Sequence, residues 1–288
     1  MSGIEVLEAG LMTTVQDQGR PGFAHLGVPR AGALDRPAAQ LANRLVGNPA
    51  DAAVLETLLG GLRVRCTSGT WVAVCGAAAA IDVDGIARGH SRPEWVPPGA
   101  VLRIGAAYAG ARTYLALAGG VGVEPVLGSR STDTLAWVGP PRVAAGDHLS
   151  LGERLGEPRA LETPRPPASG PLRVHPGPRP EHFAPDALER LCATTWSVQG
   201  DSDRIGLRLS GPPVARTDRG ELASEGMILG AVQVPPDGQP VVFLADHPPT
   251  GGYPVVGVVE ADDLWQCAQL RPGEPVRFTP ASPSSRSS

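Results

Sequence analysis

The sequence predicts a mainly β protein with two tandem β-barrel-like domains and a few short helices. Short apolar runs alternate with turn residues along the whole chain, and 37 Gly and 31 Pro among the 288 residues supply the turns. Such punctuation is typical of all-β domains. The length suits two domains, and Glu157–Gly170, rich in Pro and Arg and without hydrophobic periodicity, fits a linker between them. We therefore expect domains at residues 1–156 and 171–280, a linker at 157–170 and a disordered tail at 281–288.

Apolar runs rich in Val, Ile and Leu mark the expected strands. Those of the first domain are Ile4–Leu7, Val54–Leu59, Leu62–Cys66, Trp71–Cys75, Ile81–Val83, Val101–Ile104, Thr113–Ala118 and His148–Leu151. Those of the second domain are Leu172–His175, Val198–Gln199, Leu207–Leu209, Gly230–Val234, Val241–Leu244, Val255–Val259 and Val276–Phe278. Between two of the short apolar segments, Asp84-Gly85 predicts a two-residue hairpin turn.

Three helices are expected. In the first, Asp35 is a suitable N-cap, Pro37 lies in the first turn, and an apolar face ends before Gly47, a residue that commonly follows a helix. The second is expected at about Pro185–Trp196 and the third at Asp262–Leu270. Their small number agrees with a mainly β class.

Composition excludes several classes of function. A net charge of -4 and a pI near 5.9 favour neither nucleic acid nor a membrane surface as partner. The longest nearly apolar run, Trp71–Ile81, is too short to span a bilayer, and the first ten residues lack the basic segment of a signal peptide. Four scattered cysteines without a C-x-x-C pair suggest free thiols in a reduced, cytoplasmic protein.

All 25 basic residues are Arg, and the sequence contains no Lys. A Schiff base, a P-loop cation and a carboxylated lysine are therefore excluded, and any cation in a site must be Arg. Motifs for a Walker loop, a nucleophile elbow, a zinc protease and a dinucleotide-binding turn are also absent from the sequence. We expect no metal site, since Asp201 and Asp203 lack the spaced ligands of a calcium loop.

The first polar cluster lies in a long Gly-rich segment, Thr14–Asp35. It contains Gln16, Asp17, Arg20 and Arg30. Long loops in compact domains are often functional, and the guanidinium fork of Arg matches a carboxylate or phosphate. The alternative is a structural Asp–Arg pair that holds the loop.

Two further clusters lie in the second domain. Asp203 and Arg204 form part of an acid-rich turn before a strand, where an Asx-type turn is the simpler interpretation. Glu225 stands between small residues, where a carboxylate can act as acid or base. Gln233 precedes Pro-Pro-Asp-Gly, which otherwise marks a plain hairpin turn.

The fourth cluster follows the apolar run Val241–Ala245. Asp246 stands at its end, and Thr250, Gly251, Gly252 and Tyr253 follow. Backbone N–H groups of such a Thr-Gly-Gly segment can bind an anion, as nests do. The alternative is a glycine hairpin in which Asp246 caps a strand end.

Taken together, these segments resemble the allophanate hydrolase subunit 2 family, also known as the KipA family or the family of 5-oxoprolinase C subunits. The stretches that carry the resemblance occur in order over nearly the whole chain: Leu11–Arg20, Leu26–Asp35, Ala42–Asn48, Leu127–Thr132, Ser202–Gly206, Ser224–Gly226, Gln233–Gly238, Thr250–Pro254 and Ala268–Gly273. Two departures stand out. Ala31 occupies the place of the usual serine, which argues against a serine nucleophile there, and His247, Pro248 and Pro249 replace basic and threonine residues of the family.

The resemblance implies two cyclophilin-like β-barrels and a subunit of an ATP-dependent complex that opens the lactam of 5-oxoproline to glutamate. It also implies a KipI-like first subunit and a LamB/YcsF-type third subunit as partners, with ATP bound through another loop or shared with a partner. We expect no turnover by the chain alone. One alternative is half of a biotin-dependent carboxyltransferase of the urea carboxylase and allophanate pathway. The other is a KipA-like regulator of a kinase inhibitor that has no activity of its own.

In the 5-oxoprolinase interpretation, the residues fall into two groups. We expect catalytic roles for Asp17, Arg20, Glu225 and Asp246. We expect substrate binding by Gln16, Arg30, Asp203, Arg204, Gln233, Thr250, Gly251, Gly252 and Tyr253.

Overall fold

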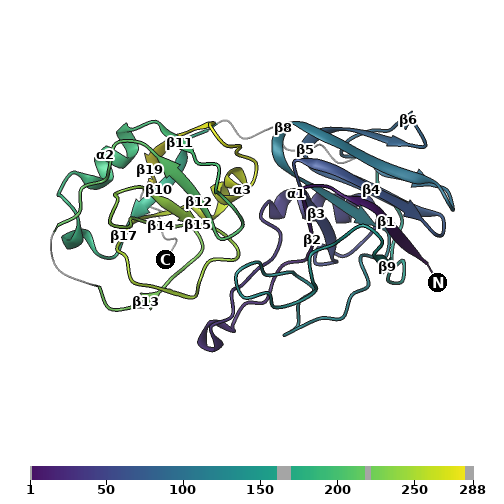
Figure 1. Cartoon of the computed structure of the whole chain (residues 1–288), viewed down its shortest axis with the longest axis horizontal. Coiled ribbons are helices and arrows are strands. Elements are labelled where there is room, and N and C mark those ends of the chain that lie inside the picture. The colour runs from purple at the N-terminus through teal and green to yellow at the C-terminus, as the bar shows by residue number, and fades with distance from the viewer. Residues whose placement is uncertain (1, 161–169, 218–221, 283–288) are drawn as a thin grey trace. The chain divides into compact units, whose positions relative to one another are not determined.

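The structure is a computed structural model that describes residues 2–160, 170–217 and 222–282. It is mainly β, and the chain divides into two compact units (Figure 1). The first unit comprises Met1–Pro21 and Ala31–Pro167, and the second comprises Gly22–Arg30 and Ala168–Ser288. Residues 22–30 thus group with the second unit. Most of the expected linker, at 161–169, and most of the expected tail, at 283–288, lie outside the described residues.

The first unit is built on a nine-stranded antiparallel sheet whose main path runs β2-β3-β8-β4-β1-β9. Strand β5 pairs with β8 off this path, and it also pairs with the short strands β6 and β7. The strands are β1 (Gly3–Ala9), β2 (Met12–Gln16), β3 (Val54–Leu58), β4 (Gly60–Cys66), β5 (Thr70–Val83), β6 (Ile86–Ala87), β7 (Glu94–Val96), β8 (Val101–Leu117) and β9 (His148–Ser150).

Two strands of this sheet are longer than the sequence predicts. The expected pair Trp71–Cys75 and Ile81–Val83 is one strand, β5, and the expected pair Val101–Ile104 and Thr113–Ala118 belongs to β8, which ends at Leu117. The Ala- and Gly-rich middles of both strands have low strand propensity. They pair with each other along β5 and β8, with three register shifts between Gly76 and Ile81. The two segments therefore form strands because they pair with each other, and β-bulges can accommodate the register shifts between them.

Alternate residues of β5 and β8 serve two cores. Val72 and Val74 join one large apolar cluster with Leu115 and Leu117, whereas the intervening Ala73 and Cys75 join a second cluster. This division follows from the two-residue period of a strand. The second cluster is completed by helix α1 (Arg36–Leu45), which packs on β5 and β8.

Helix α1 begins and ends as the sequence predicts. The Asp35 side chain accepts a hydrogen bond of 2.9 Å from the N–H of Ala38, and Gly47 follows the helix with φ +78°. The predicted hairpin turn also forms, since Asp84 and Gly85 both have positive φ, the requirement of a type I′ turn. A short 3-10 helix, η1 (Ala24–Leu26), belongs to the segment that groups with the second unit.

The second unit contains an eight-stranded sheet of order β18-β11-β12-β15-β14-β17-β10-β19 and a two-stranded sheet, β13-β16. The strands are β10 (Leu172–Pro176), β11 (Trp196–Val198), β12 (Gly206–Ser210), β13 (Glu225–Gly226), β14 (Ala231–Gln233), β15 (Val241–Phe243), β16 (Thr250–Gly251), β17 (Val255–Val259), β18 (Pro275–Val276) and β19 (Phe278–Pro280). Of the two large sheets of the protein, one is a half-barrel and the other a nearly closed barrel, so the predicted fold class is confirmed.

The helices of the second unit are shorter than predicted. Helix α2 (Ala187–Ala193) ends before Thr194, which is extended, and Trp196 already belongs to β11. The helix expected at Asp262–Leu270 is a 3-10 turn, η3 (Ala261–Asp263), followed by the single α-turn α3 (Leu264–Cys267). A further 3-10 turn is η2 (Pro180–His182).

The four cysteines are free thiols, and Cys66, Cys75 and Cys267 are buried. Burial raises the pKa of Cys66 to about 11, which keeps this thiol protonated and unreactive at neutral pH. Within the described residues, no helix has the length and apolar character needed to cross a membrane.

Candidate functional site

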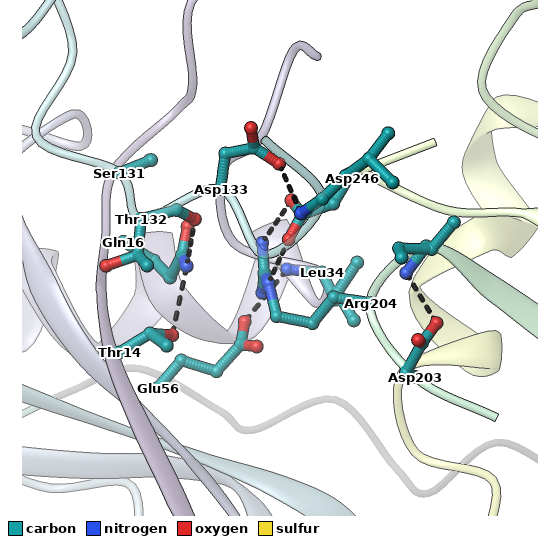
Figure 2. Close-up of polar contacts among 12 residues, drawn as sticks. Thr14, Gln16, Leu34, Glu56, Ser131, Thr132, Asp133, Asp203, Arg204 and Asp246 are labelled. Carbon is teal, nitrogen blue, oxygen red and sulfur yellow. Dashed lines mark hydrogen bonds and ion pairs between the residues drawn. The ribbon is translucent and has the colours of Figure 1, made fainter. Parts of the chain in front are cut away.

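Many of the polar residues singled out in the sequence lie in two clusters, one in each unit. In the first unit, the β2 cluster consists of Gln16, Asp17 and Arg20, at and after the end of β2, and the loop residues 126–133. In the second unit, the Asp246 cluster consists of Arg30, Arg204, Asp246 and His247. Figure 2 shows members of both clusters and their hydrogen bonds.

Asp17 in the β2 cluster is saturated with hydrogen-bond donors. Its carboxylate accepts from the hydroxyls of Ser129 and Ser131, both at 2.6 Å, and from the backbone N–H of Arg130 at 2.5 Å and of Gly19 at 2.7 Å. Four donors hold the carboxylate in place and leave it little capacity to act on a substrate. These contacts fasten the loop to the end of β2, and the catalytic role of Asp17 remains a prediction.

Arg20 is used in the same way. Its side chain is 1% exposed, and it donates to the backbone carbonyls of Val126 and Ser131. Gly139 leaves room for the guanidinium, because a Cβ there would lie 2.8 Å from Nη2 of Arg20. The alternative interpretation of the first motif, an Asp and an Arg that hold a loop, therefore describes these two residues, although each holds it through other partners rather than through a mutual pair.

Gln16 differs from its neighbours because one of its polar side-chain atoms has no hydrogen-bond partner among the described residues. Its Nε2 donates to Thr14 Oγ1 at 3.0 Å and to the Thr132 carbonyl at 2.9 Å, as Figure 2 shows. Its Oε1 and the hydroxyl of Thr132 are buried and meet no hydrogen-bond partner among the described residues. An acceptor and a hydroxyl left in this way are suited to a water molecule or to an amide. Substrate binding by Gln16 remains a prediction.

Buried polar residues that the sequence did not single out hold the segment after the β2 cluster. Glu56 on β3 accepts from the N–H of Leu34 at 3.0 Å, and the hydroxyl of Tyr114 on β8 accepts from the N–H of Asp35 at 2.7 Å. Burial, reinforced by Glu56, raises the pKa of Tyr114 well above its usual range, so the hydroxyl stays neutral. No local sequence motif identifies such residues, because the hydrogen-bond partners of a polar residue inside a strand are known only once the strands of the sheet are paired.

The Asp246 cluster contains a buried bidentate ion pair. Arg204 Nε lies 2.9 Å from Oδ2 of Asp246, and Nη2 lies 3.0 Å from Oδ1. The two side chains are 3% and 0% exposed. Arg204 precedes β12 and Asp246 follows β15, and these strands pair antiparallel with Gly206 opposite Phe243. The ladder therefore brings together two residues that are 42 positions apart, and each satisfies the charge of the other.

His247 is the titratable group of this cluster with a shifted pKa. Its ring stacks on Phe243 with centroids 5.6 Å apart, and its Nδ1 lies 2.8 Å from the carbonyl of Pro248. Burial lowers its pKa below the usual 6.5, although the Pro248 hydrogen bond and the charge of Asp246 act to raise it, and the charge of Arg30 lowers it slightly further. The imidazole is therefore neutral at pH 7. With the Nδ1 proton donated to the Pro248 carbonyl, Nε2 is the acceptor, which is the state required of a proton acceptor.

Arg30 supplies a cation to the same cluster. Its Nε is buried and has no hydrogen-bond partner among the described residues. An Arg with such a donor is able to bind a carboxylate, and a neutral imidazole in the same cluster is able to take a proton. The sequence predicted Arg30 as a substrate-binding residue, but His247 stood out only as a departure from the family pattern.

Other predicted residues come together at the two-stranded β13-β16 sheet. Glu225 pairs with Gly251, and Gly226 with Thr250. Gln233 Nε2 donates to the carbonyl of Tyr253 at 3.1 Å and lies so close to Gly251 that a Cβ on that glycine would be 2.7 Å away. The third and fourth sequence clusters thus form one region of the second unit.

Several expected roles do not suit this geometry. Glu225 accepts from Nε of Arg179 at 2.9 Å, and this bond lowers the pKa of Glu225, which weakens it as a base. Gly251 lies in a strand and neither it nor Gly252 has a positive φ, so the two do not form the expected anion-binding nest. Asp203 accepts from the N–H of Ile205 at 2.8 Å and of Gly206 at 3.1 Å, which makes it the Asx-type turn given above as the simpler interpretation.

The chain is similar over nearly its whole length to several known proteins. It is 37% identical to the C subunit of 5-oxoprolinase from Escherichia coli over 97% of this chain and 91% of that protein. The crystal structure of TTHA0988 matches with a TM-score of 0.87 and 39% identity over 97% of this chain. Urea carboxylase of Kluyveromyces lactis matches with a TM-score of 0.90 and 30% identity over 97% of this chain.

The lengths of these relatives differ. The chain spans 55% of TTHA0988 and 27% of the urea carboxylase, but nearly the whole of the E. coli protein. The family model described as carboxyltransferase domain, subdomain A and B, matches residues 26–280. This match covers most of both units. The chain therefore belongs to the carboxyltransferase domain family, subdomains A and B.

Proposed function

We propose that the chain is a subunit of an ATP-dependent 5-oxoprolinase-type complex that hydrolyses the lactam of 5-oxoproline to glutamate. The proposal is supported by the identity to the E. coli 5-oxoprolinase C subunit, a separate protein of similar length. One observation carries the chemistry: the neutral His247 lies in the same cluster as Arg30, whose Nε has no partner within the described residues. 5-Oxoproline offers a carboxylate to Arg30 and an amide whose hydrolysis needs a proton acceptor, the role given to His247.

The proposed roles of this chain are binding and proton transfer. Arg30 fixes the substrate carboxylate, and a bidentate contact of this kind also fixes orientation. His247 Nε2 accepts a proton from the water that attacks the lactam carbonyl and delivers it to the ring nitrogen as the C–N bond breaks, so that water supplies the new carboxylate oxygen and the nitrogen leaves as the amine. The buried Arg204–Asp246 pair positions His247 through the adjoining backbone, because the N–H of Asp246 donates to the carbonyl of Arg204 at 3.0 Å.

The residues of this chain do not fit ATP. The sequence has no Walker loop and no Lys. The guanidinium groups of Arg20 and Arg204 are bound to backbone carbonyls and to a carboxylate. We therefore place ATP on a KipI-like first subunit or a LamB/YcsF-type third subunit, and we expect the chain alone to be inactive.

The second candidate function is half of a biotin-dependent carboxyltransferase. It is favoured by the family model and by the urea carboxylase structure, of which this chain covers 27%. In that case Arg30 would bind the carboxyl group that carboxybiotin donates, and His247 would take a proton from urea. A third candidate, a regulator without turnover, requires only tight binding of the first subunit.

The test is kinetic and uses the complex. We expect His247→Asn to lower kcat for glutamate formation by about 10²- to 10⁴-fold, the usual contribution of a positioned acid or base. Arg30→Gln is expected to act mainly on KM for 5-oxoproline. His90→Asn is the matched control, since the pKa of His90 is also lowered by burial, but His90 belongs to the first unit. Full activity of His247→Asn would remove this residue from the mechanism.

A further inference from the structure

A pocket outside both polar clusters lies on the first unit. Its volume is about 540 Å³, within the range of small-molecule sites, roughly 300–1,000 Å³. The walls combine two tryptophans, two arginines and several prolines. The residues that the argument uses are Trp71, Arg88, Arg92, Glu94 and Trp95.

The aromatic wall of the pocket is fixed in place. The rings of Trp71 and Trp95 meet edge to face, with centroids 5.6 Å apart and planes at 62°. Trp95 also lies over Gly69, where a Cβ would come within 2.5 Å of the ring. Because Gly69 provides the room, the Trp95 ring is held against the backbone while its outer part remains exposed, at 43% for the whole residue. Such a wall offers a preformed surface to a flat ring.

The charges of the pocket leave one cation unbalanced. Arg92 Nε lies 3.0 Å from Oε1 of Glu94, which also accepts from the N–H of Gly89 at 3.0 Å. Arg88 has a buried Nε without an acceptor, and it makes no ion pair with the described residues. A buried donor without a partner is costly, and the planar fork of Arg suits a carboxylate. Because only the Arg88 guanidinium is uncompensated and the Glu94 carboxylate is nearby, the pocket favours a ligand with a single negative charge over a phosphate dianion.

We propose that this pocket binds a small aromatic monocarboxylate, with its carboxylate on Arg88 and its ring against Trp71 and Trp95. The site is separate from the residues proposed to act on 5-oxoproline. The aromatic monocarboxylate would therefore be a second ligand, distinct from 5-oxoproline and bound by the first unit. Binding at this pocket does not depend on whether the protein acts on 5-oxoproline.

The test uses phenylacetate as probe and calorimetry on the full chain. Phenylacetate should bind at least tenfold more tightly than its neutral amide, phenylacetamide, and than 5-oxoproline, which has a carboxylate without an aromatic ring. Arg88→Gln should weaken phenylacetate about ten- to a hundredfold, the range expected for loss of a charge-assisted contact. Arg92→Gln is the matched control, because this side chain is 65% exposed and paired with Glu94, and it should change the affinity less than threefold.

A second variant keeps the proposal testable if Arg88→Gln does not fold. Trp95→Ala should weaken phenylacetate about three- to tenfold, since aromatic pairs contribute roughly 0.5–1.5 kcal/mol. Quenching of tryptophan fluorescence by phenylacetate should be reduced in the same variant. Equal binding of the acid and the amide, or unchanged affinity in both Arg88→Gln and Trp95→Ala, would overturn the assignment.

Discussion

Asp246 and Arg204 show what a single buried residue contributes in this protein. Each is almost fully buried, and each neutralises the other through two hydrogen bonds. The sequence marked both residues as functional but did not pair them, because residues 42 positions apart become neighbours only through the β12-β15 ladder. By contrast, the capping role of Asp35 was predictable, since its partner Ala38 is only three positions further along the chain.

The pair yields a stability prediction. Asp246→Asn removes the charge that faces the buried Arg204 guanidinium through two hydrogen bonds, and breaking a buried pair in this way costs about 3–5 kcal/mol. The double variant Arg204→Met with Asp246→Leu removes both charges and should recover most of that loss. Urea denaturation followed by circular dichroism measures both. A single variant within about 1 kcal/mol of the wild type would mean that the pair is not buried in solution.

His247 yields a prediction on pH. Its pKa in the folded chain is lowered below 6.5 by burial, so the unfolded chain binds this proton more readily. Stability from the neutral ring is complete above pH 6.5 and is lost as the pH falls from 6.5 towards the folded pKa. NMR titration should give a His247 midpoint below 6.5. The free energy of unfolding of His247→Gln should fall less between pH 7 and 5.5 than that of the wild type, and equal slopes would contradict the assignment.

At the scale of elements, the end of β2 and the loop 126–133 act as one piece. Asp17 joins them by accepting from two serine hydroxyls and from the backbone of Arg130. The motif around Asp17 was visible in the sequence, but its partners lie more than 110 positions away. A pattern of Asp and Arg among glycines therefore identified an important segment without distinguishing a catalytic role from a structural one.

This assignment predicts the behaviour of Asp17→Ala. The change leaves two hydroxyls and two backbone N–H groups without their acceptor, and each buried donor costs about 1–3 kcal/mol. We expect a loss of about 3 kcal/mol or more, with faster amide exchange at residues 129–131. Asp147→Ala is the control, since Asp147 accepts a single bond, from Ala144, at an exposed turn. Unchanged stability with lost activity would restore Asp17 to the catalytic role predicted from the sequence.

Strands β5 and β8 show where prediction of elements fails. Runs of Val and Leu located the ends of each strand, but the Ala- and Gly-rich middles carry no local signal. These middle segments are extended because each pairs with the other along the β5-β8 ladder. The hairpin at Asp84-Gly85 was predictable because the turn itself imposes positive φ on two residues suited to it.

For the whole molecule, the fold class and the two-part organisation followed from the sequence, whereas the grouping of residues 22–30 with the second unit did not. This segment contains Arg30, which acts on His247 from a position more than 200 residues earlier. A prediction that divides the chain into continuous stretches cannot assign an early segment to the second unit.

The most direct test of the proposed function is turnover by the reconstituted complex. The chain is combined with the proposed KipI-like and LamB/YcsF-type partners, ATP and 5-oxoproline, and glutamate is measured. We predict ATP-dependent glutamate formation by the complex, none by the chain alone, and a loss in His247→Asn that is absent in His90→Asn. A complex that forms no glutamate but transfers carboxylate from carboxybiotin to urea would contradict the account.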